Sequence, residues 1–258
     1  MTDTQAPALT PENDVILQVK DLQVEYRTDD ATIYAVNGVD LTVRRNMTVG
    51  LVGETGAGKT TIQSLICRYF DIQKGQILID GVDVRHIRLD DLRRAIGVVQ
   101  QDVFLFAGTV RENIRYGKLD ATDEEIIRAA KEAHSWEFIR RLPNGLDTVL
   151  YEDSISGGQK QLLCITRVML TLPPMLILDE ATSSIDTRTE VLIQEAFDKL
   201  MEGRTSFVVA HRLSTIRNAD LILVMRDGKI IEQGSHEELL ARGGKYAELF
   251  EVQSKYYR

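Results

Sequence analysis

The sequence feature that most constrains the fold is the segment from Gly53 to Thr60, Gly-Glu-Thr-Gly-Ala-Gly-Lys-Thr. It matches the pattern G-x-x-x-x-G-K-[ST] of phosphate-binding loops. A loop can hold a polyphosphate only if many backbone N–H groups point inward, and glycines allow the tight, partly left-handed path that this requires. Lys59 brings a mobile cation to the β- and γ-phosphates, and the Thr60 hydroxyl can ligate Mg²⁺. The segment therefore predicts a nucleotide site.

The residues on either side of this loop support the same interpretation. A short apolar run over 48–52 predicts a buried strand before it, and Ile62, Leu65, Ile66 and Tyr69 predict an apolar helical face after it. We expect the helix to start at about Gly58, with its positive dipole end under the phosphates. The alternative, a glycine-rich turn with an exposed lysine, leaves these flanking patterns unexplained.

The composition narrows the class of protein. The 258 residues carry 43% apolar and 27% charged side chains, as a globular domain would, and the net charge of −8 argues against a general nucleic-acid binder. No apolar run reaches the 18 residues of a membrane span, and residues 1–14 read as a polar tail without the pattern of a signal peptide. Cys67 and Cys164 lie in apolar helical patterns, which favours two reduced core thiols.

Strand and helix patterns alternate along the chain and predict an α/β core. Alternating residues over 15–43 predict a small antiparallel layer, and a hairpin is expected around Asp227-Gly228. Buried parallel strands are expected at Ile96–Val99, Met175–Leu178 and Ser206–Ala210. Helices are expected at Thr122–Leu142 (with a Thr122/Glu125 capping box), from Ser156 onward, at Thr187–Met201 capped by Asp186, and at Lys245–Arg258.

Polar residues follow two of the predicted parallel strands. Asp179 and Glu180 end one of them, at the edge where ligands bind in parallel α/β sheets, so one carboxylate can hold Mg²⁺ and the other can orient a water. His211 leaves a neighbouring strand at the same edge. His86 and His134 have no such placement, and His236, inside a Ser235-x-x-Glu238 capping box, is expected at the surface.

Two other residues permit two interpretations each. Tyr26 ends a strand and could stack on an adenine ring, although the pattern alone favours a half-buried strand tyrosine. Ser156 and Gln159 fit a simple helix capping box, but Gly157 and Gly158 between them would also let a phosphate approach the helix N-terminus. The residues alone support both interpretations of Ser156 equally.

Taken together, the motifs resemble the nucleotide-binding subunit of ABC transporters over residues 15–253. The resemblance rests on the phosphate loop, Gln101, ISGGQ at 155–159, LILDE at 176–180, SSID at 183–186 and His211, in that order. From residue 97 onward the chain is most similar to exporter ATPases, whereas the first 60 residues look more like peptide-importer ATPases. The resemblance favours the functional interpretation of Ser156.

The resemblance implies a role for each matching residue. Glu180 would be the catalytic base, with His211, Lys59 and Gln101 completing the catalytic set, and Thr60, Gln101 and Asp179 would hold Mg²⁺. Asp186 would contact a second subunit. The residues expected to contact ATP are Tyr26, Gly53, Glu54, Thr55, Gly56, Ala57, Gly58, Lys59, Thr60, Thr61, Ser156, Gly157, Gly158 and Gln159.

The same resemblance implies an architecture and partners. The fold would be a P-loop NTPase core whose parallel sheet is flanked by helices, with an N-terminal antiparallel β layer and an inserted α-helical subdomain. Residues 1–14 would be a flexible tail, 15–101 and 169–258 the ATP-binding core, and 102–168 the helical signature subdomain. An identical or different ATPase subunit would complete a head-to-tail dimer around two ATP, and transmembrane domains would bind it at the inner face of the membrane.

Two other functions are compatible with parts of this pattern. One is a catalytically weak module that dimerises on ATP, and the presence of Glu180 and His211 counts against it. The other is a soluble ABC ATPase outside transport, which usually carries two ATP domains or a long coiled-coil insert. The chain also departs from exporters at Tyr151–Ser154, before the signature, at Gln100, and at Thr166 and Val168 in the helix after the signature.

Overall fold

The computed structural model describes residues 14–27, 32–100, 103–151, 153–179, 185–210 and 212–256. Its centre is a six-stranded sheet in the order β12-β11-β3-β10-β9-β6. The neighbours from β11 to β6 pair in parallel, and β12 pairs with β11 in antiparallel fashion. The strands are β3 (Thr48–Gly53), β6 (Ile96–Val99), β9 (Met175–Asp179), β10 (Thr205–Val209), β11 (Leu221–Arg226) and β12 (Lys229–Gly234).

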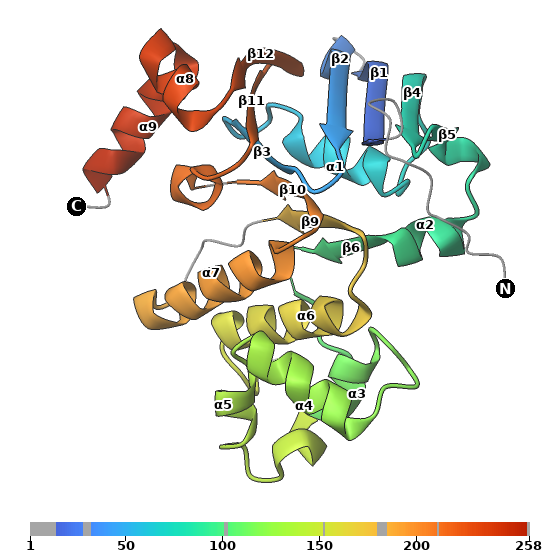
Figure 1. Cartoon of the computed structure of the whole chain (residues 1–258), viewed down its shortest axis with the longest axis vertical. Helices are drawn as coiled ribbons and strands as arrows, with labels where there is room; N and C mark the ends of the chain where they lie inside the picture. Colours follow the sequence, from blue (N-terminus) through green and yellow to red (C-terminus); the bar gives the residue numbers. More distant parts are fainter. Residues whose placement is uncertain are drawn as a thin grey trace, which may run out of the picture.

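A second, antiparallel sheet covers one face of this central sheet. Its order is β2-β1-β4-β5, and helix α1 lies between the two sheets, as Figure 1 shows. Ile62, Leu65 and Ile66 of α1 share one core with the antiparallel strands and with one face of the central sheet. The elements are β1 (Val15–Arg27), β2 (Thr32–Arg44), α1 (Lys59–Ile66), β4 (Lys74–Ile79), β5 (Val82–Asp83), a 3₁₀ turn (Val84–His86) and α2 (Leu89–Ala95).

Two long helices cover the opposite face of the central sheet. Helix α6 (Gly157–Thr171) and helix α7 (Thr187–Met201) pack against strand residues of the other parity, such as Leu176 and Leu178. Strand side chains alternate between faces, so α1 and α6 lie on opposite sides of the sheet. The C-terminal helices α8 (His236–Arg242) and α9 (Lys245–Tyr256) pack beside β12, and a 3₁₀ turn (Leu213–Ile216) precedes β11.

A group of short helices packs on the far side of α6 (Figure 1). Ile114, Ile126 and Ile139 form a third core with Leu163 of α6. The elements are β7 (Gly108–Thr109), α3 (Val110–Arg115), α4 (Asp123–Glu132), α5 (Trp136–Ile139), a 3₁₀ turn (Gly145–Asp147) and β8 (Val149–Leu150). Among the described residues, no helix combines the length and the apolar character needed to cross a membrane.

The expected α/β fold with a parallel sheet and an antiparallel layer is confirmed. The bounds of α7 and its Asp186 cap match the prediction, since the Asp186 side chain accepts from the Thr189 N–H. The 227–228 turn of the hairpin is also confirmed. Cys67 and Cys164 are free thiols, and burial raises the pKa of Cys67 to about 12.

Three sequence predictions are wrong. The single helix expected over 122–142 is two helices, because His134 adopts a left-handed φ of 56° and ends the first one. Tyr69 is not on the apolar face of α1: the helix ends before Arg68, which has a φ of 52°, and Tyr69 is 46% exposed. His236 is buried instead of at the surface, and its Nδ1 lies 2.7 Å from the Tyr246 hydroxyl.

Candidate nucleotide site

The phosphate loop joins β3 to α1 by a path that needs glycine at three positions. Gly53, Gly56 and Gly58 have φ values of 155°, 83° and 100°. A side chain at Gly53 would meet the Met225 carbonyl oxygen at 2.3 Å, and one at Gly58 would meet the Ala35 carbonyl oxygen at 2.1 Å. Gly56 faces open space, so only its backbone conformation requires glycine there. The loop is thus fixed between β2 and the end of β11.

Lys59 is the first residue of α1, and its side chain returns across the loop. It is buried, and its Nζ donates to the carbonyl oxygens of Gly53 at 2.7 Å and Glu54 at 3.0 Å. Burial lowers the pKa of Lys59, and the negative charge of Asp179 opposes that shift. A cation held by two neutral carbonyl groups at a helix N-terminus is well placed to exchange them for phosphate oxygens.

Asp179 lies at the edge of the sheet where the parallel strands end. Strands β3, β10, β9 and β6 are parallel, so their carboxyl ends lie together, and the pairing sets Asp179 beside Val209. Asp179 is buried, and its negative charge acts to raise the pKa of Lys59. Gln101, Glu180 and His211 lie outside the described residues, but each closely follows a strand that ends at this edge. Their roles stay predictions.

Mg²⁺ fits the side chains at this edge. The Thr60 hydroxyl is exposed in the first turn of α1, and the carboxylate of Asp179 ends β9. One hydroxyl and one carboxylate suit a cation that takes its remaining ligands from water and phosphate oxygens. Within the described parts of the chain, no cluster of three or more His, Cys, Asp and Glu side chains forms an all-protein metal site.

Tyr26 lies near the phosphate loop and is open to solvent. It pairs with Ile33 across β1 and β2, two residues before the Ala35 carbonyl that abuts Gly58. Tyr26 is 54% exposed, which is compatible both with a half-buried strand tyrosine and with a ring that is open to a ligand. This position leaves its ring face available for an adenine. Residues 28–31, between β1 and β2 in the sequence, lie outside the described residues.

Ser156 begins α6 with the predicted capping box. Its Oγ accepts from the Gln159 N–H at 3.3 Å, and the Gln159 side chain accepts from the Ser156 N–H at 3.0 Å. The two glycines that follow differ. A side chain at Gly158 would meet Thr189 Cγ2 of α7 at 2.4 Å, whereas Gly157 has no atom within 4 Å of such a side chain. Gly158 is therefore required by packing within the chain, and Gly157 is not.

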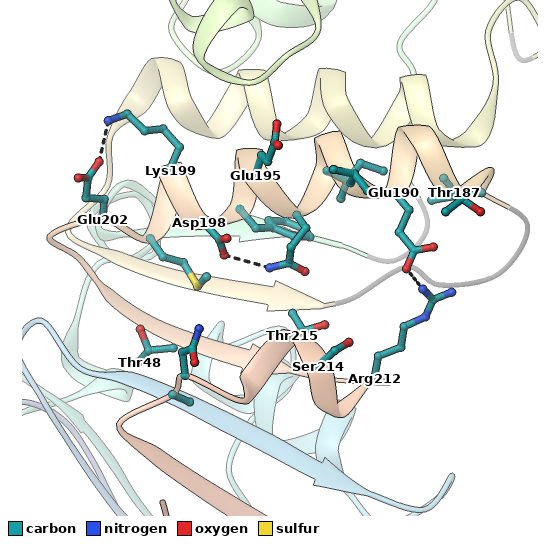
Figure 2. Close-up of a pocket in the computed structure, with 18 residues that line it drawn as sticks. Thr48, Thr187, Glu190, Glu195, Asp198, Lys199, Glu202, Arg212, Ser214 and Thr215 are labelled. Carbon is teal, nitrogen blue, oxygen red and sulfur yellow. Dashed lines mark hydrogen bonds and ion pairs between the residues drawn. The ribbon is translucent and has the colours of Figure 1, made fainter. Parts of the chain in front are cut away.

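A separate cleft of about 1340 Å³ lies between α7 and residues 212–219 (Figure 2). Several of its polar side chains pair with one another: Glu190 with Arg212, Lys199 with Glu202, and Gln194 with Asp198, to which it donates. Of the described residues that line it, the two cations, Lys199 and Arg212, are each paired with a carboxylate, and none of the lining residues belongs to the phosphate loop. It does place Arg212, next to His211, against the first turn of α7.

Sequence reasoning missed one residue at the loop. Lys245, the first residue of α9, forms an ion pair with Glu54, whose Oε1 lies 2.9 Å from its Nζ. The available signal was local: a lysine in the first turn of a helix opposes the helix dipole, which suggests that another contact holds it. Its partner could not be read from the sequence, because the two residues are far apart along the chain.

Comparison with known proteins identifies the family of the chain. A family model described as ABC transporter matches residues 36–183. An ATP-dependent lipid A-core flippase of Syntrophus aciditrophicus is 48% identical over 93% of this chain and 39% of its own length. A fatty acid ABC transporter ATP-binding/permease protein of Mycobacterium bovis is 51% identical over 83% of this chain and 34% of its own length.

A solved structure, of a bacterial Atm1-family ABC exporter with ATP bound, superposes with a TM-score of 0.85. It is 42% identical, and the match covers 98% of this chain and 44% of that one. The chain thus spans 34–44% of the length of these proteins. The importer likeness of the first 60 residues stays a prediction. The chain belongs to the ABC transporter family, as its ATP-binding module.

Proposed function

We propose that two copies of this chain close head to tail around two Mg-ATP, hydrolyse them, and so drive transport through permease domains at the inner face of a membrane. The observation that carries the proposal is the loop itself: glycine-dictated backbone, the Lys59 ammonium directed back across it, and buried Asp179 beside it. These groups neutralise and orient phosphates, which is most of what phosphoryl transfer requires of a protein.

The arrangement of α1 and α6 supports a site shared between two chains. The two helices cover opposite faces of one sheet, so the sheet separates Ser156 from Lys59 within a single chain. Gly157 is exposed, and its space is empty within the chain. A second copy that brings its phosphate loop to this helix N-terminus would use both the open space and the aligned N–H groups.

The chain's own residues divide the chemistry as follows. Lys59 and the loop N–H groups bind the β- and γ-phosphates, while Glu180 accepts a proton from the attacking water and His211 donates to the γ-phosphate. Bound Mg²⁺, held by Thr60, Gln101 and Asp179, would supply charge neutralisation. Tyr26 stacks on the adenine. Ser156 and Gly157 of the second chain complete the enclosure of the γ-phosphate.

An exposed aromatic group next to α6 supports a permease partner. Phe104 is 69% exposed and Tyr116 is 61% exposed, and the Phe106 ring lies between them, stacked on Tyr116 at 4.0 Å. Arg167 of α6 holds this group: its guanidinium donates to the Phe104 carbonyl oxygen and lies 5.3 Å from the Phe106 ring. We propose that a permease domain covers these aromatics, since the Mycobacterium bovis relative is named as an ATP-binding/permease protein.

Mixing two inactive variants tests the shared site. Lys59→Ala removes the phosphate-binding cation, and Ser156→Arg blocks the helix N-terminus. In a mixed dimer, the intact loop of the Ser156→Arg chain meets the intact helix N-terminus of the Lys59→Ala chain, so one working site forms. Phosphate release from the mixture should exceed that of either variant alone. Activity no higher than that of the separate variants would show that each site lies within a single chain.

A further inference from the structure

An acidic side chain lies in the phosphate loop, where negative charge opposes the binding of ATP. Glu54 is the second residue of the loop, and its carbonyl oxygen accepts from the Lys59 Nζ at 3.0 Å. Its side chain is 62% exposed, while the side chain of Lys245, its ion-pair partner, is only 25% exposed. The loop's own carboxylate is therefore neutralised by a residue from the C-terminal helix.

The backbone of Lys245 is fixed to the central sheet. Glu232 of β12 accepts the N–H groups of Lys245 and Tyr246 through its two carboxylate oxygens. Gly244 packs so closely on the same carboxylate that a side chain there would meet the Glu232 Oε1 at 2.2 Å. Because β12 pairs with β11, and β11 with β3, the anchor of Lys245 is continuous with the strand that carries the loop.

Helix stability does not account for a lysine at this place. A cation in the first turn of a helix is unfavourable, and Glu248 within the same turn compensates only part of it, with an ion pair at 3.3 Å. The side chain also reaches Glu54, which lies far from Lys245 along the sequence. The hydrogen bonds to Glu232 thus direct Lys245 at the loop, and the lysine slightly lowers the stability of α9.

We propose that Lys245 is a positioning residue for nucleotide binding: by pairing with Glu54 it keeps the loop's carboxylate neutralised and held away from the phosphates. The proposal rests on the proposed function, since it concerns how tightly the same loop binds ATP. The ion pair lowers the pKa of Glu54 and raises that of Lys245, so both groups remain charged over the physiological range. Without Lys245, the Glu54 carboxylate repels the incoming triphosphate.

A double-mutant cycle on ATP affinity tests this inference. We would titrate the full chain and the variants Lys245→Met, Glu54→Gln and Glu54→Gln/Lys245→Met with a fluorescent ATP analogue at low ionic strength. Lys245→Met should weaken binding about fivefold, a size that an exposed to half-buried ion pair can supply. The double variant should bind within about twofold of Glu54→Gln, because Lys245 then has no carboxylate to neutralise. The loss should shrink at high salt.

The control is Lys255→Met, which removes the same charge from the same helix. Lys255 pairs with Glu251 at 2.7 Å within α9. The Lys255→Met variant should bind the analogue with the same affinity as the unmodified chain. Thermal unfolding without nucleotide checks that each variant is folded, and Lys245→Arg should keep most of the affinity. Equal binding by Lys245→Met and the unmodified chain would overturn the inference, as would an equal loss with and without Glu54. If the unmodified chain fails to bind ATP, the proposed function fails instead.

Discussion

The ammonium group of Lys59 donates to the carbonyl oxygen of Gly53 at 2.7 Å, so the side chain spans the loop from the helix back to the strand. To bind a triphosphate, the ammonium must exchange its hydrogen bonds to the carbonyl oxygens of Gly53 and Glu54 for hydrogen bonds to phosphate oxygens. Hydrogen bonds to charged groups contribute about 1.5–3 kcal/mol each, so replacing Lys59 by Ala should weaken ATP binding by roughly 10- to 100-fold. Titration with a fluorescent ATP analogue measures this loss, and an unchanged affinity would contradict the assignment of the loop.

The two glycines of the signature should respond differently to the same substitution. Gly158→Ala would place its methyl carbon 2.4 Å from Thr189 Cγ2. Overpacking of this kind lowers the unfolding free energy by about 1–3 kcal/mol. Gly157→Ala meets no atom within 4 Å, so the chain should keep its stability but lose ATP-dependent association. Denaturant unfolding and light scattering separate the two effects. If Gly157→Ala still associates on ATP, Gly157 has no role in association.

Thr166 should stabilise the junction of α4, α5 and α6. Its Oγ1 donates to the Leu162 carbonyl oxygen at 2.7 Å and lies 2.8 Å from the Ser135 Oγ, and both side chains are buried. Thr166→Val removes these hydrogen bonds with little change in shape and should cost about 1–2 kcal/mol. A double-mutant cycle with Ser135→Ala, by denaturant unfolding, should show non-additive effects. Additive effects would mean that the two hydroxyls do not act together.

Buried His236 should make stability depend on pH. Burial, together with the positive charge of Arg217, lowers the pKa of His236 from its ordinary value of 6.5. As the pH falls below about 6.5, the unfolded chain binds a proton that the folded chain does not, so the unfolding free energy decreases. His236→Gln should reduce the difference in unfolding free energy between about pH 7.5 and about pH 5.5. Denaturant unfolding at both pH values measures this difference, and an unchanged difference in His236→Gln would contradict the prediction.

The parts of the fold that local signals determine could be predicted from the sequence. Asp186 caps α7, and the helix runs to Met201 as its apolar stripe indicates. The helix expected over 122–142 was wrong because its break depends on a tertiary contact: Ser135 turns inward to the Ala130 carbonyl and to Thr166. The capping box around His236 predicts a position at the surface, whereas in the structure Tyr246 and Phe250 of α9 pack against it.

The candidate site also contains residues that local sequence patterns predict and residues that only tertiary packing brings together. The phosphate loop and Asp179 could be located because spacing and strand order define them. The Lys245–Glu54 ion pair could not, because it depends on how α9 returns to the sheet through Glu232. The local residues do not separate the two interpretations of Ser156: the capping box is present, and a phosphate at the same helix N-terminus is compatible with it.

The central claim, that ATP joins two chains, is tested most directly by solution mass. Glu180→Gln keeps the size of the side chain but removes the predicted base, so the ATP-bound state should accumulate. Light scattering should show a doubled mass with Mg-ATP, a single mass without it, and no doubling when Ser156→Arg is added. A single mass at ATP concentrations that saturate the loop would contradict the shared site and leave Ser156 as a helix cap.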